Sequence, residues 1–226
     1  MIRLQTEDLT TGYRTPDRQQ RLIPLQTGLN LQVRAGQILG VTAPSGAGKS
    51  TLLATIAGLL PVVSGRIFVD EVDVTDRPVH QRRIAMVFQE PALFGHLSVL
   101  DNVAYGPRRH GLHKAAARAH AAELLAWVGL ANLAERSVHT LSGGQAQRVA
   151  LVRALASDPA VLLLDEPFSA LDAPLRQRLG DELAQIVRDR SVAALHVTHD
   201  PQEALRICDV TLELGAHSPP SQQGWM

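Results

Sequence analysis

The chain has 226 residues, 45% of them hydrophobic and 19% charged, which is typical of one globular domain able to bury a sizeable core. Lysine plus arginine equals aspartate plus glutamate at 22 each. This balance excludes the overall basic field by which many proteins bind nucleic acid, so we expect no nucleic-acid partner. The N-terminus lacks an apolar signal core, and no stretch approaches about 20 uninterrupted apolar residues, so we expect neither export nor a membrane span.

The first 40 residues predict a small antiparallel sheet. Apolar and polar residues alternate between 25 and 33, the pattern of a half-buried strand. A polar insertion at 14–21 interrupts the earlier part, and Tyr13 stands at its edge. A tyrosine there is usually a packed amphipathic ring, but it could also stack on a base.

An apolar strand at 37–42 then runs through the loop APSGAGKST (43–51) into a helical segment. Gly46 and Gly48 permit tight backbone turns whose N–H groups can cradle phosphate oxygens, Lys49 can reach the phosphates and Ser50 can ligate Mg²⁺. The alternative is a chance glycine turn. Ala43 stands where the strict motif has glycine; if that position required positive φ, alanine would cost roughly 1 kcal/mol, and we expect it to be tolerated.

Gln89 follows an apolar strand at 84–88, so its amide oxygen could face a metal or a water, or merely cap a loop. From residue 91 to 132 the chain becomes rich in alanine and leucine and predicts an inserted helical lobe, with helices near 99–105 and 114–128. The basic residues at 112–127 favour a solvated helix face over nucleic-acid contact, because aromatics are not interleaved.

The stretch from Leu141 to Asp172 holds two candidate phosphate-handling features. Ser142, Gly143 and Gly144 precede a helical run, and small residues at a helix start let backbone N–H groups point at an anion. Asp165 and Glu166 end the apolar run 161–164, the pattern of a buried parallel strand. Ligands bind at that end of such sheets, so these carboxylates are candidates for metal binding and proton transfer; a solvated strand end is the alternative.

A helix at 175–188 and a buried strand at 192–197 follow, and the strand delivers His199 to the same sheet edge as Asp165. His199 could hydrogen-bond a phosphate oxygen near neutral pH, whereas His196, inside the strand, is expected to be packed. A last strand near 210–214 precedes a tail that we expect to be mobile.

In this order, the motifs resemble the ATP-binding cassette family, the nucleotide-binding subunits of ABC transporters. The matching pieces are APSGAGKST at 43–51 (Walker A), Gln89 (Q-loop), LSGGQ at 141–145 (signature), VLLLDE at 161–166 (Walker B), SALD at 169–172 (D-loop) and His199 (switch histidine). The resemblance implies an α/β fold: a P-loop NTPase core with a mainly parallel sheet, an N-terminal antiparallel β subdomain and an inserted α-helical lobe. It places the core at 1–90 and 159–215, the lobe at 91–158 and the tail at 216–226.

The resemblance also implies roles for these residues in binding and hydrolysing ATP with Mg²⁺. Glu166 would polarise the attacking water, His199 would hold the γ-phosphate, Gln89 would sense it, and Asp165, with Ser50 and Gln89, would hold the metal. Tyr13 matches the aromatic that stacks on adenine. The expected nucleotide contacts from the Walker A loop are Pro44, Ser45, Gly46, Ala47, Gly48, Lys49, Ser50 and Thr51. Those expected to bind the ATP of a second subunit are Ser142, Gly143, Gly144 and Gln145.

The implied partners are a second copy of the chain, with ATP sandwiched between the two, integral membrane permease subunits and a solute-binding protein. We expect a peripheral position on the cytoplasmic face of the inner membrane. The stretch VFQEPALFGHLSVLDNVAYG and the run THDPQEAL look like bacterial importers of oxyanions, metals or cofactors such as molybdate or thiamine. An exporter ATPase or a soluble non-transport ATPase remains an alternative.

Phe94, Leu97 and Val99 could line the permease groove or belong to the lobe core. Because little sequence follows Gly215, we expect neither the extra C-terminal β domain of many importer cassettes nor regulation through one.

Overall fold

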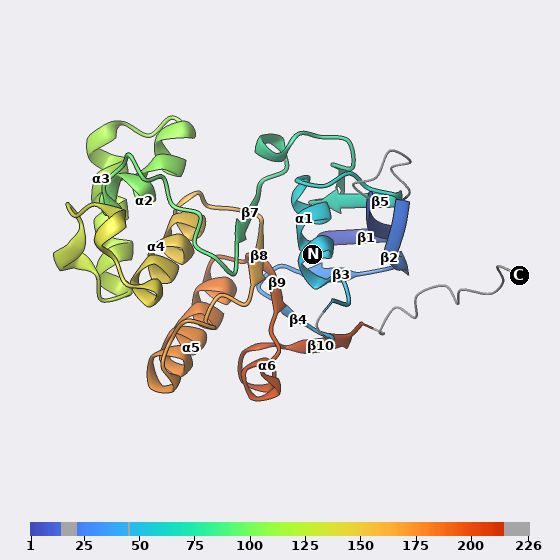
Figure 1. Cartoon of the computed structure of the whole chain (residues 1–226). Helices are drawn as coiled ribbons and strands as arrows, with labels where there is room; N and C mark the ends of the chain where they lie inside the picture. Colours follow the sequence, from blue (N-terminus) through green and yellow to red (C-terminus); the bar gives the residue numbers. More distant parts are fainter. Residues whose placement is uncertain (15–21, 45, 215–226) are drawn as a thin grey trace, which may run out of the picture.

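The strands form two sheets of different kinds in the computed structural model, which describes residues 1–14, 22–44 and 46–214 (Figure 1). The first is antiparallel and has the order β2-β1-β5-β6, with β3 also paired to β1. Its strands are β1 (Ile2–Arg14), β2 (Leu22–Leu29), β3 (Gln32–Arg34), β5 (Ser64–Val69) and β6 (Val72–Asp73). The predicted strand at 25–33 is therefore two strands, which the turn at 30–31 separates.

The second sheet is wholly parallel, with the order β10-β4-β9-β8-β7. Its strands are β4 (Ile38–Thr42), β7 (Ile84–Val87), β8 (Val161–Asp165), β9 (Ala193–Val197) and β10 (Val210–Glu213). Strands β8 and β9 are buried throughout, as their continuous apolar sequences predict. All five carboxyl ends lie at one edge of the sheet, and the residues that follow them make the candidate site.

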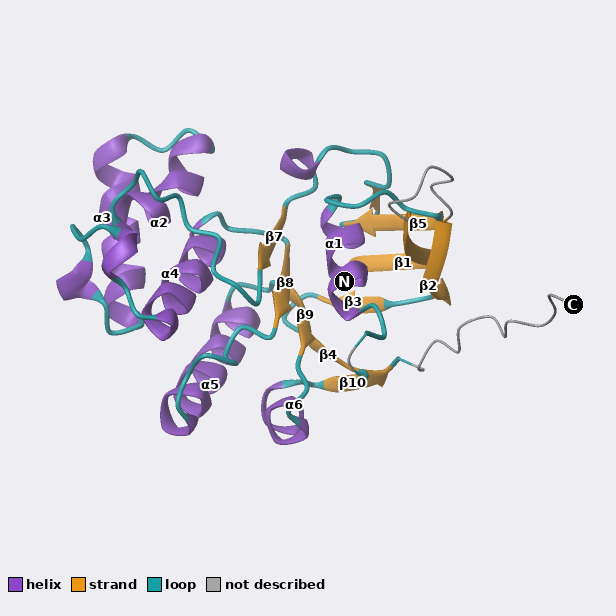
Figure 2. Cartoon of the chain, in the orientation of Figure 1, coloured by secondary structure: helices purple, strands orange, loops and turns teal. Residues whose placement is uncertain are grey.

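Helix α1 (Lys49–Ala57) packs between the two sheets, where it contacts β1 on one side and β7, β8 and β9 on the other. Figure 2 shows α2 (Val99–Arg109), α3 (Lys114–Trp127) and α4 (Gly143–Ala156) grouped at one end of the molecule, with the antiparallel sheet at the other. Helices α5 (Ala173–Asp189) and α6 (Pro201–Ile207) lie below the parallel sheet in this view. Three short 3₁₀ turns complete the described helices, at Val79–Gln81, Ala131–Leu133 and Val138–Thr140.

This architecture confirms the predicted fold class: a parallel α/β core, an N-terminal antiparallel β subdomain and a helical lobe. Within the described ranges, no helix combines the length and the apolar content needed to cross a bilayer. The predicted mobile tail at 216–226 and most of the polar insertion, residues 15–21, lie outside the described residues.

On the predicted solvated basic face of α3, Lys114 is exposed, whereas Arg118 is partly exposed and paired with acidic residues. Its guanidinium makes ion pairs with Asp101 of α2 at 2.6 Å and with Glu135 at 2.5 Å. The sequence could not reveal these pairs, because each acidic partner lies 17 residues away along the chain. Arg118 therefore contributes to the packing of the lobe, not to a free basic surface.

The C-terminal end of α1 is held by a buried arginine, Arg82. Its Nε donates to the Arg77 carbonyl at 2.8 Å, Nη1 to the Ile56 carbonyl at 3.0 Å and Nη2 to the Thr75 carbonyl at 2.7 Å. The side chain fits closely here, because a Cβ on Gly58 would lie 2.5 Å from Arg82 Nε. One side chain thus links the end of α1 to the segment 75–77 through three backbone carbonyls, of which that of Ile56 is buried.

Arg82→Leu is expected to lower the free energy of unfolding by about 2–5 kcal/mol, because a buried charged donor and its bonds to three backbone carbonyls are lost. The measurement is urea denaturation of the variant beside Arg83→Leu. Arg83 is exposed and makes an ion pair with Asp70 at 3.1 Å, so its loss should cost no more than about 1 kcal/mol. Equal losses for the two variants would contradict this role of Arg82.

Candidate active site

Four loops meet at the carboxyl edge of the parallel sheet because β9 lies between β4 and β8. Val197 near the end of β9 pairs with Val41 on one side and with Asp165 on the other. His199 therefore follows in the same row as the loop after β4 and the carboxylates after β8. Strand β7, which borders β8, adds Gln89 to the same edge.

The glycine loop between β4 and α1 has the backbone that its sequence predicts. Gly46 has φ of 80° and Gly48, the residue that caps α1, has φ of 88°, both in the left-handed region that favours glycine. Ala43 is not among the described residues with positive φ, so alanine causes no backbone strain there. The expectation that Ala43 is tolerated agrees with this geometry. Ser45 lies outside the described residues.

Lys49 points into the loop that precedes it. Its Nζ donates to the Ala43 carbonyl at 2.7 Å and to the Pro44 carbonyl at 3.1 Å. Gln26 of β2 supports the loop from the antiparallel sheet, because its Nε2 donates to the Ala47 carbonyl at 2.8 Å. The ammonium group is thus held beside backbone that can receive an anion.

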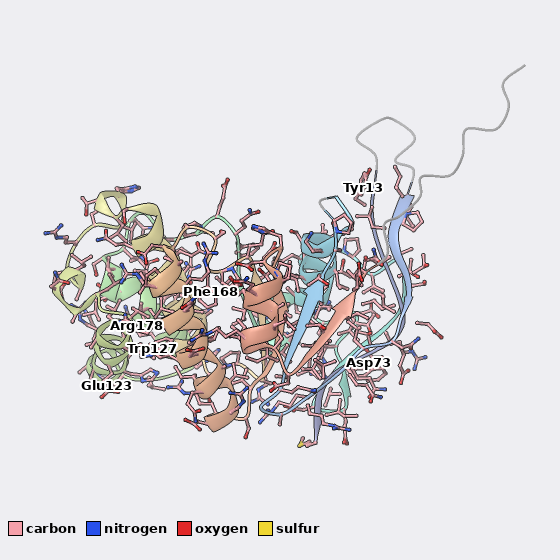
Figure 3. The ribbon with its side chains drawn as sticks, turned by 90° about the horizontal axis from the view of Figure 1, so that it is seen from below. Tyr13, Asp73, Glu123, Trp127, Phe168 and Arg178 are labelled. Atoms are coloured by element: carbon pink, nitrogen blue, oxygen red, sulfur yellow. The ribbon has the colours of Figure 1, made fainter. Side chains whose placement is uncertain are left out.

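Tyr13 is connected to this loop by strand pairing in the antiparallel sheet. It pairs with Ile23 of β2, the strand that also supplies Gln26, and its side chain is 46% exposed. Figure 3 shows Tyr13 at the outer end of its strand, far from the helical lobe. The ring is exposed rather than packed, which favours the predicted stacking role over a core role.

Asp165 is the most buried acidic group of the site, with 6% exposure. Burial raises its pKa and the neighbouring Glu166 raises it further, while a hydrogen bond from Ser50 and the charge of Lys49 lower it. The hydroxyl of Ser50 and this carboxylate are hard oxygen donors suited to Mg²⁺. The described residues contain no group of three or more His, Cys, Asp or Glu that could hold a metal.

Two side chains contact the same carboxylate oxygen of Glu166. Its Oε2 accepts from Gln89 Nε2 at 3.3 Å and lies 3.0 Å from His199 Nδ1. The glutamate has φ of 47°, a left-handed conformation that is uncommon for a residue with a side chain. Its N–H donates to the Val197 carbonyl at 3.0 Å, which holds this conformation in place. The structure therefore brings together Gln89, Glu166 and His199, which the sequence predicts to act together.

His196, as expected, is a packed residue. It is fully buried, its Nε2 lies 2.7 Å from Glu203 Oε1, and its ring centroid lies 6.1 Å from that of Phe168. The imidazole faces the core between β9 and α6 and does not join the Glu166 cluster.

The signature segment caps helix α4. Ser142 Oγ accepts from the Gln145 N–H at 3.4 Å, and Gln145 Oε1 accepts from the Ser142 N–H at 2.9 Å, which makes a capping box. Ser142 and Gly143 are exposed. Gly144 lies against the 169–172 segment, since a Cβ there would be 3.1 Å from Leu171 Cδ2 and 3.2 Å from the Ala170 carbonyl oxygen. This surface is open to a second molecule and is separate from the Glu166 cluster.

Two links around the site were not predicted, one from a buried side chain and one from a partly exposed side chain. Gln147, with 1% exposure, donates from Nε2 to the Phe88 carbonyl at 3.0 Å, next to Gln89. Arg176 donates to the Leu171 carbonyl and to Asp200. Gln147 lies two residues beyond the LSGGQ motif, in a helix that also carries Arg148 and Arg153, so the local sequence gives no clear signal of a buried polar contact. Nothing in the local sequence points to Arg176.

Of the three residues considered for a permease groove, Val99 is fully buried and belongs to the lobe core. Phe94 is partly exposed and packs on Tyr105, with 4.7 Å between ring centroids, and under the Arg153 guanidinium at 5.2 Å. Asn102, fully buried, accepts from the Phe94 N–H at 2.8 Å and donates to the Ser98 carbonyl at 2.9 Å. The surface near Phe94 is thus held in a fixed shape.

Comparison with known proteins gives a consistent set of similarities. The family model described as ABC transporter matches residues 26–169. The chain is 49% identical over 181 residues to the Fe(3+) ions import ATP-binding protein FbpC of Agrobacterium fabrum, covering 80% of this chain and 51% of the relative. It is 47% identical over 185 residues to the sulfate/thiosulfate import ATP-binding protein CysA of Neisseria meningitidis, with 80% and 52% covered. The chain spans about half the length of the curated relatives it matches.

A similar solved structure is a dimeric, post-hydrolysis state of the ATP-binding cassette MJ0796 bound to ADP and Pi. It has a TM-score of 0.84 and 28% sequence identity, and covers 98% of this chain and 100% of that one. A second dimeric structure of MJ0796, a bacterial ABC transporter cassette, has the same TM-score at 29% identity, covering 93% and 94%.

The two loop glycines are expected to differ in their response to alanine. Gly48→Ala combines an unfavourable φ with a Cβ 2.9 Å from Leu25 Cβ, whereas Gly46→Ala meets no atom within 4 Å. The first should lower the free energy of unfolding by about 2–4 kcal/mol and the second by about 1–2 kcal/mol, in urea denaturation without nucleotide. If Gly46→Ala costs as much as Gly48→Ala, the contact with Leu25 is not what restricts position 48.

Proposed function

Because this chain belongs to the ABC transporter family, whose model it matches over residues 26–169, we propose that it is an ATP-hydrolysing subunit that powers transport through separate membrane permeases. The convergence of Gln89 and His199 on one oxygen of Glu166 is the observation that carries the proposal. A carboxylate held between an amide and an imidazole, beside a phosphate-binding loop, suits the activation of water for attack on a phosphoryl group.

The glycine loop would bind the phosphates. Lys49 would turn from the carbonyls of Ala43 and Pro44 to phosphate oxygens, a small change for a flexible side chain. The loop N–H groups, after left-handed turns at Gly46 and Gly48, would complete this binding. Tyr13 would stack on the base.

Ser50 and Asp165 would hold Mg²⁺, with the amide oxygen of Gln89 as a further ligand. Bound Mg²⁺ neutralises the charge that develops on the transferred phosphoryl group. The buried position of Asp165 raises its pKa and disfavours an uncompensated negative charge, so a nearby cation would favour ionisation.

Glu166 would take part directly in the chemical step by accepting a proton from the attacking water. His199 would hold the γ-phosphate, and Gln89 would report its presence to the helical lobe. The left-handed backbone of Glu166 directs the carboxylate toward these partners, and such strained residues gather at active sites.

We infer that two copies of the chain are needed for a complete site. Ser142 and Gly143 are exposed at the N-terminus of α4, where N–H groups favour an anion. The similar MJ0796 structures are dimeric, which supports a head-to-tail pair in which this segment binds the nucleotide of the partner subunit. A two-fold pair gives both subunits the same surface, so two sites form together.

The transported substance is proposed to be a small solute taken up by import. Similar proteins are named as import ATP-binding proteins for Fe(3+) ions and for sulfate/thiosulfate, and one as a putative import ATP-binding protein for 2-aminoethylphosphonate. Integral membrane permeases and a solute-binding protein would be the partners, and the chain would lie at the cytoplasmic face of the inner membrane. The groove near Phe94 and Leu97 would receive the permease.

Glu166→Gln is expected to lower the ATP hydrolysis rate by about 100-fold or more while ATP affinity stays within about threefold, because only proton transfer is lost. Light scattering with ATP should then detect a trapped dimer. Glu123→Gln, an exposed change on α3, is the matched control and should behave as wild type. Ordinary turnover in Glu166→Gln would contradict the proposed role of this residue.

Purification of the tagged chain from membranes of its own cells is expected to recover a hydrophobic permease in a fixed ratio. Phe94→Asp should reduce this recovery at least about fivefold, since a buried charge in an apolar contact is costly, without abolishing ATP binding. Recovery of ribosomes or DNA in place of a permease would overturn the transport proposal.

A further inference from the structure

The guanidinium of Arg176, in the first turn of α5, joins two loops that flank the candidate active site. Its Nη2 donates to the Leu171 carbonyl at 3.0 Å, and its Nη1 to Asp200 Oδ2 at 3.3 Å. The side chain is 29% exposed, and its buried Nε has no hydrogen-bond partner within the part of the chain that the structure describes. The two outer nitrogens therefore make the link, each to a different loop.

At one end of this link, Asp200 directly follows His199 and is itself held in place by hydrogen bonds. Asp200 Oδ1 caps α6 by accepting from the N–H groups of Gln202 at 2.9 Å and Glu203 at 3.3 Å. Its other oxygen, Oδ2, accepts from Arg176. Because His199 is the preceding residue, any displacement of Asp200 also changes the 3.0 Å separation of His199 Nδ1 from Glu166 Oε2.

At the other end, Leu171 belongs to the segment 169–172 that borders the signature. Ser169 Oγ in this segment donates to the Glu166 carbonyl at 3.0 Å. Leu171 lies against Gly144. A small cavity of about 40 Å³ lies between Glu166, Arg176 and His199, so the three side chains face one space. Arg176 thus connects the segment beside the signature to the loop that carries the histidine.

From this arrangement we infer that Arg176 is a positioning residue for ATP hydrolysis, which holds His199 against Glu166 in response to the segment 169–172. The inference rests on the proposed function. In the proposed dimer the second subunit reaches the surface around Ser142 and this segment, so its arrival would be transmitted through Leu171, Arg176 and Asp200 to His199. Hydrolysis would then depend on subunit contact.

Arginine suits this role better than lysine. Its planar fork places two donors in fixed directions, one for a carbonyl and one for a carboxylate, whereas an ammonium is a single point of charge. The Arg176–Asp200 pair is partly exposed, and such a pair adds little to stability. Loss of this pair should therefore lower the rate of ATP hydrolysis and leave the stability of the fold nearly unchanged.

The test compares steady-state ATP hydrolysis by the full chain for wild type, Arg176→Ala, Arg176→Lys and Asp200→Asn. Asparagine at 200 can still cap α6, so it isolates the contact with Arg176. We expect each variant to lower kcat by about 10-fold to 100-fold, with the KM for ATP within about twofold, because a misplaced catalytic group slows the chemical step. The double variant Arg176→Ala with Asp200→Asn should be no slower than the slower single variant, because the two residues act through one contact.

Arg178→Ala is the matched control. Arg178 lies on the same helix and is exposed. Its one ion pair among the described residues is a long one, with 3.9 Å between its Nε and Oε1 of Glu182. Figure 3 places it on the lobe side of the molecule, away from Phe168. This variant should keep the wild-type kcat, and thermal unfolding should confirm that all variants are folded.

Three outcomes would overturn the inference: a kcat within twofold of wild type for both Arg176→Ala and Asp200→Asn, a loss confined to KM, or rate losses that multiply in the double variant. If Arg176→Ala fails to fold, Arg176→Lys and Asp200→Asn decide the question by the same criteria. If the wild-type chain hydrolyses no ATP, the proposed function itself is refuted. If the wild type and all the variants hydrolyse ATP at similar rates, only the role of Arg176 is refuted.

Discussion

The parallel register around β9 is the constraint on which the rest of the site depends. Val197 pairs with both Val41 and Asp165, so the loops after three strands begin in one row. A slip of one residue would turn every side chain of the strand to the opposite face. Strands β8 and β9 are buried throughout, so a slip would require the side chains packed on both faces to rearrange. The apolar core therefore sets the 3.0 Å separation between Glu166 and His199.

Two unfavourable features gather at this edge, and neighbouring contacts offset each of them. Glu166 has a left-handed backbone, which its N–H bond to the Val197 carbonyl maintains. Asp165 has a buried carboxylate, to which Ser50 supplies a hydrogen bond and Lys49 a charge. The packing of α1 between the sheets brings both of these residues to Asp165. The fold thus keeps a charge-bearing group where ligands bind instead of removing it to solvent.

Features encoded by consecutive residues could be predicted from the sequence, namely the glycine loop, the buried strands and the carboxylates that follow them. The contacts of three other residues could not be predicted, because their partners are distant in the sequence. Phe88 is 59 residues from Gln147, Ala47 is 21 residues from Gln26, and Asp200 is 24 residues from Arg176. Which groups these residues contact depends on which strands are neighbours in the sheet. The local sequence pattern does not determine that strand order. The ion pairs of Arg118 could not be predicted for the same reason, because the acidic groups belong to other segments of the lobe.

Helix α4 is attached at two points to the segment that contains Gln89. Gln147 donates to the Phe88 carbonyl at 3.0 Å, and Arg153 donates to the Ala92 carbonyl at 2.7 Å. These residues are nearly two helical turns apart, or about 9 Å along the axis. A segment fastened over such a length cannot slide on the helix and must tilt with it. A rotation of α4 against the parallel sheet would therefore displace this segment and change the 3.3 Å contact of Gln89 with Glu166.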